Sequence, residues 1–294
     1  MLEPQNTRIG FIGIGVMGKS MAGHLLAGGY KVAVYNRTKS KAEELLAKGA
    51  EWQENIAEMA AECDVVITMV GYPKDVEAVY LGAGGLVANA KQGACLVDMT
   101  TSSPLLAAKI YEAAKARGVL VLDAPVSGGD VGAKNAKLSI MVGGDAEAFA
   151  AVKPIFALMG NNINHMGAAG AGQHTKMSNQ IAIASNMMGV CEAVAYAQKA
   201  GLDPQAVIKC IETGAAGSFS LSNLAPRMLA GDFAPGFYVK HFIKDMTIAL
   251  SVAEEMGLMT PGLKQAKMLY EQLAAEGGAD YGTQALVKLY LNRV

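Results

Sequence analysis

The sequence has few of the residues that build metal sites and disulfide frameworks. Its 294 residues include only four cysteines, four histidines and one tryptophan. The cysteines lie far apart along the chain and no two histidines stand four residues apart, so neither a zinc motif nor a redox-active cysteine pair is expected. We predict that the protein holds no metal and that its cysteines are buried free thiols in a reducing compartment.

An excess of charge of either sign is also missing. The chain carries 25 Lys and Arg against 26 Asp and Glu, a formal net charge of −1, which argues against a nucleic-acid partner. Its longest uncharged apolar stretches contain Asn, Gln and Gly, so no membrane span is expected. The apolar run after Arg8 is broken by glycines and makes a poor signal peptide. These features predict a cytoplasmic protein without a membrane partner.

Apolar residues and glycine are abundant. Hydrophobic residues make up 52% of the chain and charged residues 17%, which excludes an intrinsically disordered protein. The 34 glycines are clustered rather than periodic, which excludes collagen and marks places where the backbone turns sharply or approaches another group closely. A chain of 294 residues is long enough for two domains.

Short apolar segments alternate with helical segments up to about residue 165. Such alternation predicts a parallel β-sheet covered by helices on both faces. The expected strands are residues 8–14, 31–35, 64–70, 95–99, 119–123 and 138–142. The expected helices are one that ends at Ala27 and those over residues 39–48, 104–117 and 146–159.

The pattern changes after Gly172, beyond which no segment has the character of a strand. Residues 175–198 are apolar on nearly every face, as expected for a long buried helix. Further helices are expected from Asp203-Pro204 onward and over residues 238–256, 261–276 and 283–291. The second half of the chain is therefore predicted to be all-α, and the helix over residues 175–198 joins the two halves.

A glycine-rich turn follows the first expected strand and precedes the first expected helix. Its residues are Gly13, Ile14, Gly15, Val16, Met17 and Gly18, a G-x-G-x-x-G pattern. In this context the first glycine permits a tight turn, the second lets a pyrophosphate approach the backbone, and the third lets helix and strand pack closely. The pyrophosphate would meet the free N–H groups of the helix N-terminus. A turn without a ligand is the alternative, which the strand–turn–helix context disfavours.

The predicted fold class is α/β, a Rossmann-type doubly wound sheet followed by an all-α C-terminal domain. We expect an NADP-binding domain over residues 1–168. An all-helical substrate and dimerisation domain, beginning with the long interdomain helix, is expected over residues 169–294. The helices after Gly172 are more apolar than one small domain needs, so a homodimer or homotetramer is expected.

The residues after the second expected strand bear on the choice of cofactor. NAD sites usually carry Asp or Glu about 20 residues beyond the glycines, where it binds the ribose hydroxyls. This sequence has Asn36, Arg37 and Thr38 there and no acid before Glu43. A guanidinium pairs with the 2′-phosphate of NADP, whereas a carboxylate repels it. We predict that NADP(H) is preferred, with NAD(H) as the second choice; a solvated loop arginine is the alternative.

Polar or glycine-rich segments follow two later strands. Thr101 lies in residues 98–102, at a strand end where ligands of open α/β sheets bind, although the neighbouring serines are also suited to capping a helix. Ser127, Gly128 and Gly129 follow another strand. They would expose successive N–H groups to a substrate carboxylate, unless they form an ordinary turn.

One lysine stands out in the apolar second half. Lys176 is the only charged residue between Lys153 and Glu192, and it opens the long buried helix. Burial and a helix N-terminus both lower the pKa of an ammonium group, which suits proton donation near neutrality. The alternative is a lysine whose ammonium group reaches solvent from a helix start.

These segments and the glycine-rich turn resemble the β-hydroxyacid dehydrogenase family over essentially the whole chain. Its members include 3-hydroxyisobutyrate dehydrogenase, tartronate semialdehyde (2-hydroxy-3-oxopropionate) reductase and glyoxylate or succinic semialdehyde reductases. The resemblance implies that Thr101 lies beside the nicotinamide and that Lys176 is the acid/base. It assigns substrate binding to Ser127, Gly128 and Gly129.

Two positions further along complete the expected site. Many family members have Asn four residues after the lysine, where this chain has Gln180 preceded by Asn179. Either amide is suited to binding a substrate hydroxyl or carboxylate, and Asn-Gln at this place resembles tartronate semialdehyde reductases. Lys244 matches the lysine of the family's Lys-Asp pair, which lies near cofactor and substrate. If the resemblance to the family is set aside, the segment around Lys244 indicates a basic helix face exposed to solvent.

We therefore predict an NAD(P)-dependent oxidoreductase that interconverts a small β-hydroxyacid and its semialdehyde by hydride transfer, as 3-hydroxyisobutyrate dehydrogenase does. Reduction of tartronate semialdehyde, succinic semialdehyde or glyoxylate is the alternative, and a non-catalytic NADP(H)-binding protein is a third. A decarboxylating 6-phosphogluconate dehydrogenase would carry His where this chain has Asn179, and imine reductases usually replace the residue at Lys176. The expected partner is a small substrate that bears a carboxylate.

Overall fold

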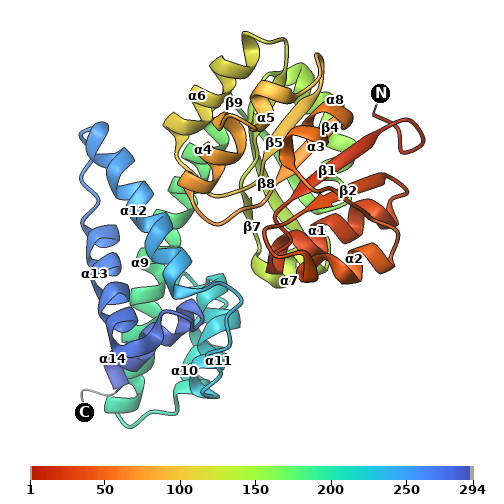
Figure 1. Cartoon of the computed structure of the whole chain (residues 1–294). Coiled ribbons are helices and arrows are strands. Elements are labelled where there is room, and N and C mark those ends of the chain that lie inside the picture. Colours follow the sequence, from red (N-terminus) through yellow and green to blue (C-terminus); the bar gives the residue numbers. More distant parts are fainter. Residues whose placement is uncertain (1, 292–294) are drawn as a thin grey trace. The chain divides into compact units, whose positions relative to one another are not determined.

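The computed structural model describes residues 2–291. The chain divides into two compact units, Met1–Lys176 and Met177–Val294 (Figure 1). Each unit has its own apolar core, as described below. Over the described residues, no helix combines the length and the apolar character that crossing a bilayer requires.

A nine-stranded sheet forms the centre of the first unit. Its order is β3-β2-β1-β4-β5-β6-β8-β7, and β9 pairs with β8. The strands are β1 (Arg8–Ile12), β2 (Lys31–Tyr35), β3 (Glu51–Trp52), β4 (Val65–Thr68), β5 (Cys95–Asp98), β6 (Leu120–Asp123), β7 (Val126–Ser127), β8 (Leu138–Gly144) and β9 (Gly160–Gly167). All six predicted strands are present. The sequence pattern missed β3 and β7, which have two residues each, and the largely polar β9.

The sheet is not wholly parallel, which corrects the prediction. Strands β1 to β6 pair in parallel with one another, and β9 pairs in parallel with β8, whereas β8 runs antiparallel to both β6 and β7. Only residues 128–137 join β7 to β8, and a parallel crossover needs about a dozen residues or more. In the interior of the sheet, β1 lies between β2 and β4, so the strand order reverses there. Open α/β sheets bind ligands beyond the carboxyl ends of the strands at this reversal.

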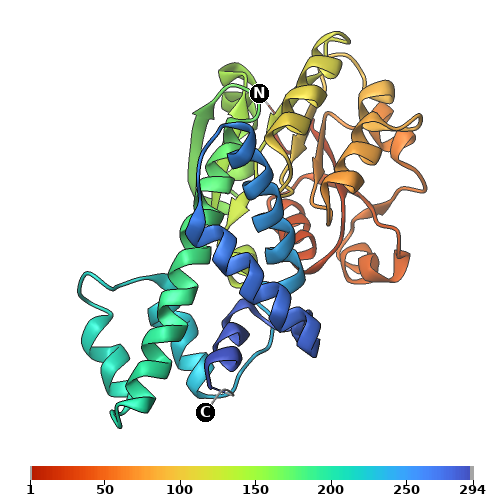
Figure 2. The same cartoon turned by 90° about the vertical axis from the view of Figure 1, so that its left-hand side faces the viewer.

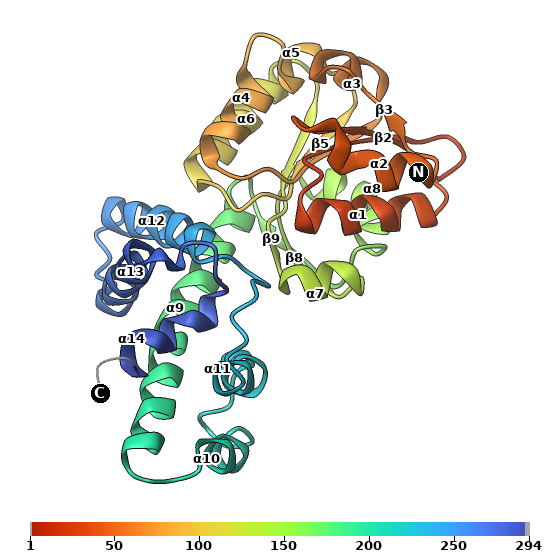
Figure 3. The ribbon, with the colours of Figure 1, turned by 60° about the horizontal axis from the view of Figure 1, so that its bottom comes forward.

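Helices cover both faces of the sheet, as predicted (Figure 3). One face carries α1 (Val16–Ala27), the 3₁₀ turn η1 (Lys39–Ala42), α2 (Glu43–Ala47), α7 (Gly129–Lys134) and α8 (Ala146–Phe156). The other face carries α3 (Ile56–Glu62), α4 (Pro73–Leu81), α5 (Leu86–Asn89) and α6 (Pro104–Lys115). Because successive strand residues point to opposite faces, Val32 and Val34 join the first core and Ala33 the second. The sequence pattern missed α3, α4, α5 and α7.

The second unit is built from helices, and beyond β9 the described chain contains no strand, as predicted. Helix α9 (Ala171–Lys199) begins in the first unit and continues through the second. The remaining elements are α10 (Pro204–Ile211), the π-helical turn η2 (Ser220–Leu224), α11 (Ala225–Leu229), α12 (Val239–Glu255), α13 (Pro261–Leu273), the π-helical turn η3 (Ala274–Gly278), the 3₁₀ turn η4 (Thr283–Val287) and α14 (Lys288–Leu291). The predicted helices over residues 261–276 and 283–291 thus each consist of two elements.

Helix α9 is the centre of the second core, but it is not buried on every side. Met187, Cys191 and Val194 are buried and pack with residues of α12 and α13, whose ribbons lie beside α9 in Figure 2. In contrast, Tyr196 is 74% exposed, and Ala182 is also exposed. The prediction of burial all round is therefore wrong for the chain taken singly.

Candidate functional site

The glycine-rich turn lies between β1 and α1, and its three glycines meet different surroundings. Gly13 has φ +100°, and a Cβ there would overlap the backbone of Met69. A Cβ on Gly18 would overlap the carbonyl oxygen of Gly13. A Cβ on Gly15, by contrast, would meet no atom of the described chain within 4 Å. Packing therefore explains Gly13 and Gly18, whereas Gly15 borders open space that a ligand can enter.

The N-terminus of α1 is suited to an anion. Gly15 is the N-cap residue of α1. Among the described residues, no side chain forms a capping hydrogen bond there. The first turn also contains no acidic residue. The N–H groups of Val16 and Met17 therefore lie at the positive end of the helix dipole without a carboxylate nearby in the helix. This arrangement fits the pyrophosphate of a dinucleotide.

The residues that follow β2 lie beside this turn. Asn36 accepts a hydrogen bond from the Ile14 N–H through Oδ1 at 3.0 Å, and its Nδ2 donates to the Thr38 carbonyl at 2.8 Å. The Arg37 side chain is 82% exposed, and its Nη1 lies 3.5 Å from Asp75 Oδ1. Asn36 therefore fixes the end of β2 against the glycine-rich turn, while most of the Arg37 guanidinium faces solvent.

A buried polar network joins the ends of β4 and β5. Thr68 Oγ1 donates to Asp98 Oδ1 at 2.8 Å, and the Thr100 N–H donates to the same oxygen at 3.1 Å. The Tyr80 hydroxyl lies 3.0 Å from Thr68 Oγ1, and the Val70 N–H donates to Thr100 Oγ1 at 3.0 Å. Burial raises the pKa of Asp98 to about 6, although the hydrogen bonds from Thr100 and Thr68 oppose it.

Asp123, at the end of β6, holds the start of α9. Its Oδ1 accepts from the Gly170 N–H at 2.7 Å and its Oδ2 from the Gln173 N–H at 2.8 Å. Burial raises the pKa of Asp123 to about 6, and these backbone hydrogen bonds oppose the rise. Asp123 is also the register partner of Asp98 on β5. The ends of both strands therefore contribute to one polar network.

Ser127, Gly128 and Gly129 follow β6 and lead into α7. Gly128 and Gly129 have φ of +128° and +62°, a conformation that favours glycine at both positions. Ser127 is half-buried and Gly128 is exposed. Backbone N–H groups of such a turn are accessible to a small carboxylate.

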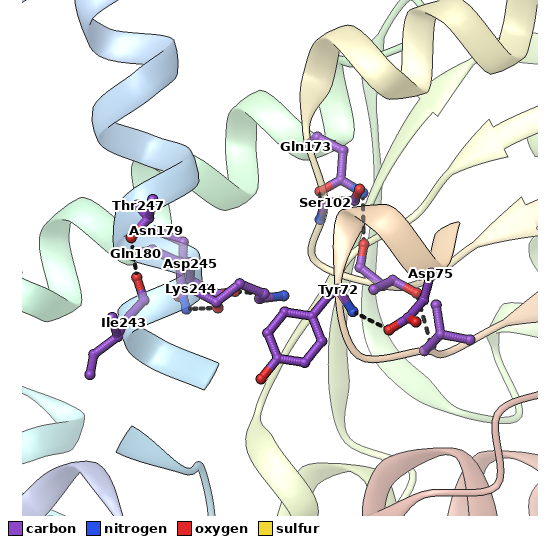
Figure 4. A network of polar contacts seen from close by, with 12 residues as sticks. Tyr72, Asp75, Ser102, Gln173, Asn179, Gln180, Ile243, Lys244, Asp245 and Thr247 are labelled. Carbon is purple, nitrogen blue, oxygen red and sulfur yellow. Dashed lines mark hydrogen bonds and ion pairs between the residues drawn. The ribbon is translucent and has the colours of Figure 1, made fainter. Parts of the chain in front are cut away.

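Lys176 lies in the second turn of α9 and is 6% exposed. Gln173, one helical turn earlier, is fully buried. Its Nε2 donates to the Thr100 carbonyl at 2.7 Å, and its Oε1 accepts from the Ser102 N–H at 2.9 Å (Figure 4). Lys176 and Thr101 are thus carried by two segments of the first unit that share direct hydrogen bonds.

The second unit contains the other predicted site residues. Asn179 Nδ2 donates to Gln180 Oε1 at 2.7 Å, and Gln180 Nε2 donates to Asp245 Oδ2 at 2.6 Å (Figure 4). Lys244 Nζ lies 2.9 Å from Asp245 Oδ1. Gln180 and Asp245 are each 1% exposed. The structure therefore groups Asn179, Gln180 and Lys244 around one buried carboxylate.

Sequence reasoning missed two residues of this arrangement. Asp123 was expected only as the last residue of a strand, and Gln173 received no role. A fully buried amide and a buried carboxylate need specific partners, but those partners lie 47 to 73 residues away along the chain. The only local signal was a polar residue at the end of an apolar strand and another at the start of an apolar helix.

Two family models together match nearly the whole chain. The model described as the NAD binding domain of 6-phosphogluconate dehydrogenase matches residues 8–167. The model described as the NAD-binding of NADP-dependent 3-hydroxyisobutyrate dehydrogenase matches residues 170–290.

Individual proteins match over similar lengths. The chain is 64% identical over 283 residues to an uncharacterised oxidoreductase of Bacillus subtilis, which covers 96% of this chain and 98% of that protein. It is 38% identical over 281 residues to 2-hydroxy-3-oxopropionate reductase of Escherichia coli, at 96% coverage of both. The solved structure of Mycobacterium tuberculosis 3-hydroxyisobutyrate dehydrogenase with L-serine superposes with a TM-score of 0.89 at 31% identity, covering 96% of this chain and 98% of that one.

The different surroundings of Gly15 and Gly18 give a prediction. Gly15→Ala should lower the free energy of unfolding by less than about 1 kcal/mol, because its backbone is extended at φ −88° and its Cβ meets no protein atom, which leaves only the weaker N-cap preference of Ala. The same change should weaken NADPH binding by about tenfold or more, since the methyl group blocks the approach of a pyrophosphate. Gly18→Ala should instead lower the free energy of unfolding by about 1–3 kcal/mol. Thermal unfolding and fluorescence titration with NADPH measure the two effects. Equal loss of stability in both variants would contradict the assignment.

The raised pKa of Asp98 predicts how its replacement changes stability with pH. Because the folded pKa of about 6 exceeds the usual value of 3.8, the ionised carboxylate disfavours folding, and stability falls as pH rises from about 4 to about 6. Asp98→Asn removes this contribution. The stability of the variant relative to wild type should therefore improve by about 1–3 kcal/mol between pH 4 and pH 7. Urea unfolding at several pH values measures it, and parallel curves for the two proteins would refute it.

Proposed function

The chain belongs to the β-hydroxyacid dehydrogenase family, whose members are NAD(P)-dependent oxidoreductases that act on hydroxyl groups, and we propose that it interconverts a small β-hydroxyacid and its semialdehyde. The observation that carries this proposal is the setting of Lys176. It is a buried lysine on a helix whose start is hydrogen-bonded to the ends of β5 and β6. Those strand ends lie on the edge of the sheet where dinucleotide ligands bind.

The residues of the first unit fit a nicotinamide dinucleotide. The open space at Gly15 and the uncapped N-terminus of α1 suit the pyrophosphate. Asn36, Arg37 and Thr38 would surround the adenosine ribose. We assign a preference for NADP(H), because a mostly exposed guanidinium can pair with the 2′-phosphate, and NAD(H) is the second choice. Thr101 would lie beside the nicotinamide.

The bound reduced nicotinamide supplies the hydride that adds to the aldehyde carbon of the substrate. Lys176 donates a proton from Nζ to the developing alkoxide oxygen, so that the C=O group becomes CH–OH. In the reverse direction the same lysine, now neutral, accepts the hydroxyl proton. Helix α9 contributes rigidity, because the Asp123 carboxylate holds its first N–H groups.

The proposed substrate carries a carboxylate one carbon away from the carbon of the reacting carbonyl or hydroxyl group. Ser127, Gly128 and Gly129 would bind that carboxylate through a hydroxyl and backbone N–H groups. The relative from Mycobacterium tuberculosis holds L-serine, a β-hydroxyacid, which supports this substrate class. Asn179 would orient the substrate, and Lys244 would complete the positive surroundings.

Reduction of 2-hydroxy-3-oxopropionate (tartronate semialdehyde) is the second candidate. The chain is 38% identical to an enzyme with that activity. Gln180 also stands where many 3-hydroxyisobutyrate dehydrogenases have Asn, and the Asn179-Gln180 pair resembles tartronate semialdehyde reductases. Methylmalonate semialdehyde carries a methyl group on C2, whereas tartronate semialdehyde carries a hydroxyl group there. One assay series with both aldehydes therefore distinguishes the two candidate functions.

We also propose a homodimer or homotetramer assembled through the second unit. Large apolar side chains of that unit are exposed to solvent in the single chain, among them Tyr196 at 74%, Phe219 at 69% and Met259 at 89%. Exposed apolar surface of this kind is commonly covered by another copy in symmetric oligomers.

The experiment that tests the function is a panel of aldehydes assayed by NADPH oxidation. It contains methylmalonate, tartronate and succinic semialdehydes and glyoxylate. Wild type should reduce at least one of the first two, and Lys176→Ala should lower its kcat by about 10²-fold or more while NADPH binding persists. Lys176→Arg should be similarly slow, because a guanidinium keeps the charge but does not release its proton. The exposed Lys199→Ala of the same helix is the control. A wild-type rate in Lys176→Ala would overturn the mechanism.

The preference for NADP(H) is tested at Arg37. Arg37→Ala should raise the KM for NADPH by about tenfold or more and leave the KM for NADH nearly unchanged, because only NADPH carries the 2′-phosphate. Lys31→Ala, at the opposite end of β2, removes an equal charge and should change neither value. If Arg37→Ala changed both KM values alike, the guanidinium would have no part in selecting the cofactor.

A further inference from the structure

The Gln173 side chain forms an unusual pair of contacts with the turn after β5. Its Nε2 donates to the carbonyl of Thr100 at 2.7 Å, and its Oε1 accepts from the N–H of Ser102 at 2.9 Å. The two backbone groups flank a single residue, Thr101. The amide of Gln173 therefore pairs with the backbone on both sides of Thr101, as a neighbouring β-strand would.

The backbone of Gln173 is fixed as firmly as its side chain. Its N–H donates to Asp123 Oδ2 at 2.8 Å, and the Gly170 N–H donates to the other oxygen of the same carboxylate. Gln173 is fully buried, so water does not compete for these groups. One residue thus connects the end of β6, the turn after β5 and the first turn of α9.

The position of Gln173 along α9 matters because Lys176 follows it by three residues. Residues three apart lie on neighbouring positions of a helix, and a helical turn is rigid. The Gln173 side chain therefore ties the helical turn that carries Lys176 to the backbone on either side of Thr101. A buried amide needs hydrogen-bond partners even if it has no role in catalysis. Such a purely structural role and a role in positioning Lys176 against Thr101 predict different effects of substitution.

We infer that Gln173 is a positioning residue that holds Thr101, and with it the nicotinamide, at a fixed distance from Lys176. This inference rests on the proposed function. Hydride and proton must reach the two ends of one C=O bond together, and a misplacement of about 1 Å can cost on the order of 10²-fold in rate. The Gln173 clamp supplies the required precision without touching substrate or cofactor.

Two variants of similar size test the inference. Gln173→Met removes both hydrogen bonds and keeps the apolar volume. It should lower kcat by about tenfold or more, leave the NADPH Kd within about threefold, and increase the deuterium isotope effect from NADPH labelled at C4. Gln173→Glu keeps the shape, but only its protonated carboxyl can both donate to the Thr100 carbonyl and accept from the Ser102 N–H.

The Gln173→Glu variant should therefore recover activity at acidic pH. Three charged groups belong to the segments that meet at position 173: Asp123 accepts from the Gln173 N–H, Asp98 accepts from the Thr100 N–H, and Lys176 lies three residues further along α9. All three are also present in wild type. Dividing the kcat of the variant by that of wild type at each pH removes the part of their titration that the two proteins share. This ratio should rise by about tenfold between about pH 8 and about pH 5.5. A role in packing alone predicts a flat ratio.

The control is Thr175→Ala, which removes a hydrogen bond from the same helical turn to the Ala171 carbonyl and none to the turn at Thr101. It should leave kcat and the isotope effect unchanged. Wild-type kcat in Gln173→Met, or a flat ratio in Gln173→Glu, would overturn the inference.

A second measurement is independent of turnover. Amide hydrogen exchange at Ser102, whose N–H donates to Gln173, should accelerate in Gln173→Met and stay slow in Thr175→Ala. If wild type reduced no aldehyde of the panel, the proposed function would fail, while faster exchange at Ser102 would still show that the clamp exists. Unchanged exchange in Gln173→Met would overturn the inference even in an active enzyme.

Discussion

The carboxylate of Asp123 is the contact on which the arrangement around Lys176 depends. It lies at the end of β6 and accepts hydrogen bonds from the Gly170 and Gln173 N–H groups at the start of α9. A helix N-terminus is the positive end of a dipole, so a carboxylate there stabilises the helix and fixes where it begins. Space is also short: a Cβ on either Gly143 or Gly172 would lie within 3 Å of a carboxylate oxygen of Asp123. The rigid sheet thus determines the position of the helix that carries the lysine.

Burial of the Asp98 and Asp123 carboxylates lowers the stability of the folded protein, and this loss helps to explain their role. Burial raises the pKa of both Asp98 and Asp123 to about 6, so each is less favourable ionised in the folded protein than in water. Apolar residues at these positions would avoid that penalty, but they could not bind the N–H groups of Thr100, Gly170 and Gln173. The chain therefore gives up some stability at neutral pH for a fixed geometry at the edge of the sheet, a pattern typical of functional sites.

Local sequence was enough to predict the parts of the site that form within one strand–turn–helix segment. The segment from Gly13 to Gly18 runs from the end of β1 into the first turn of α1, and burial of Lys176 follows from the apolar residues around it. Contacts between distant segments could not be predicted, because neither periodicity nor composition records them. The contact between Ser102 and Gln173, which are 71 positions apart in the sequence, and the antiparallel course of β8 become visible only when the sheet is assembled. Short strands such as β3 carry too little pattern to detect.

Gln180 shows how neighbouring side chains can occupy a buried amide completely. Its side chain places the amide against Asp245, and both ends of that amide have partners, Asp245 and Asn179. A buried amide with both ends satisfied gains little from a substrate, since it would have to break one of these bonds first. Asn179, which is half-buried and linked to Gln180, is the better candidate for substrate contact. Gln180, which is itself held by Asp245, thus fixes the orientation of the Asn179 amide.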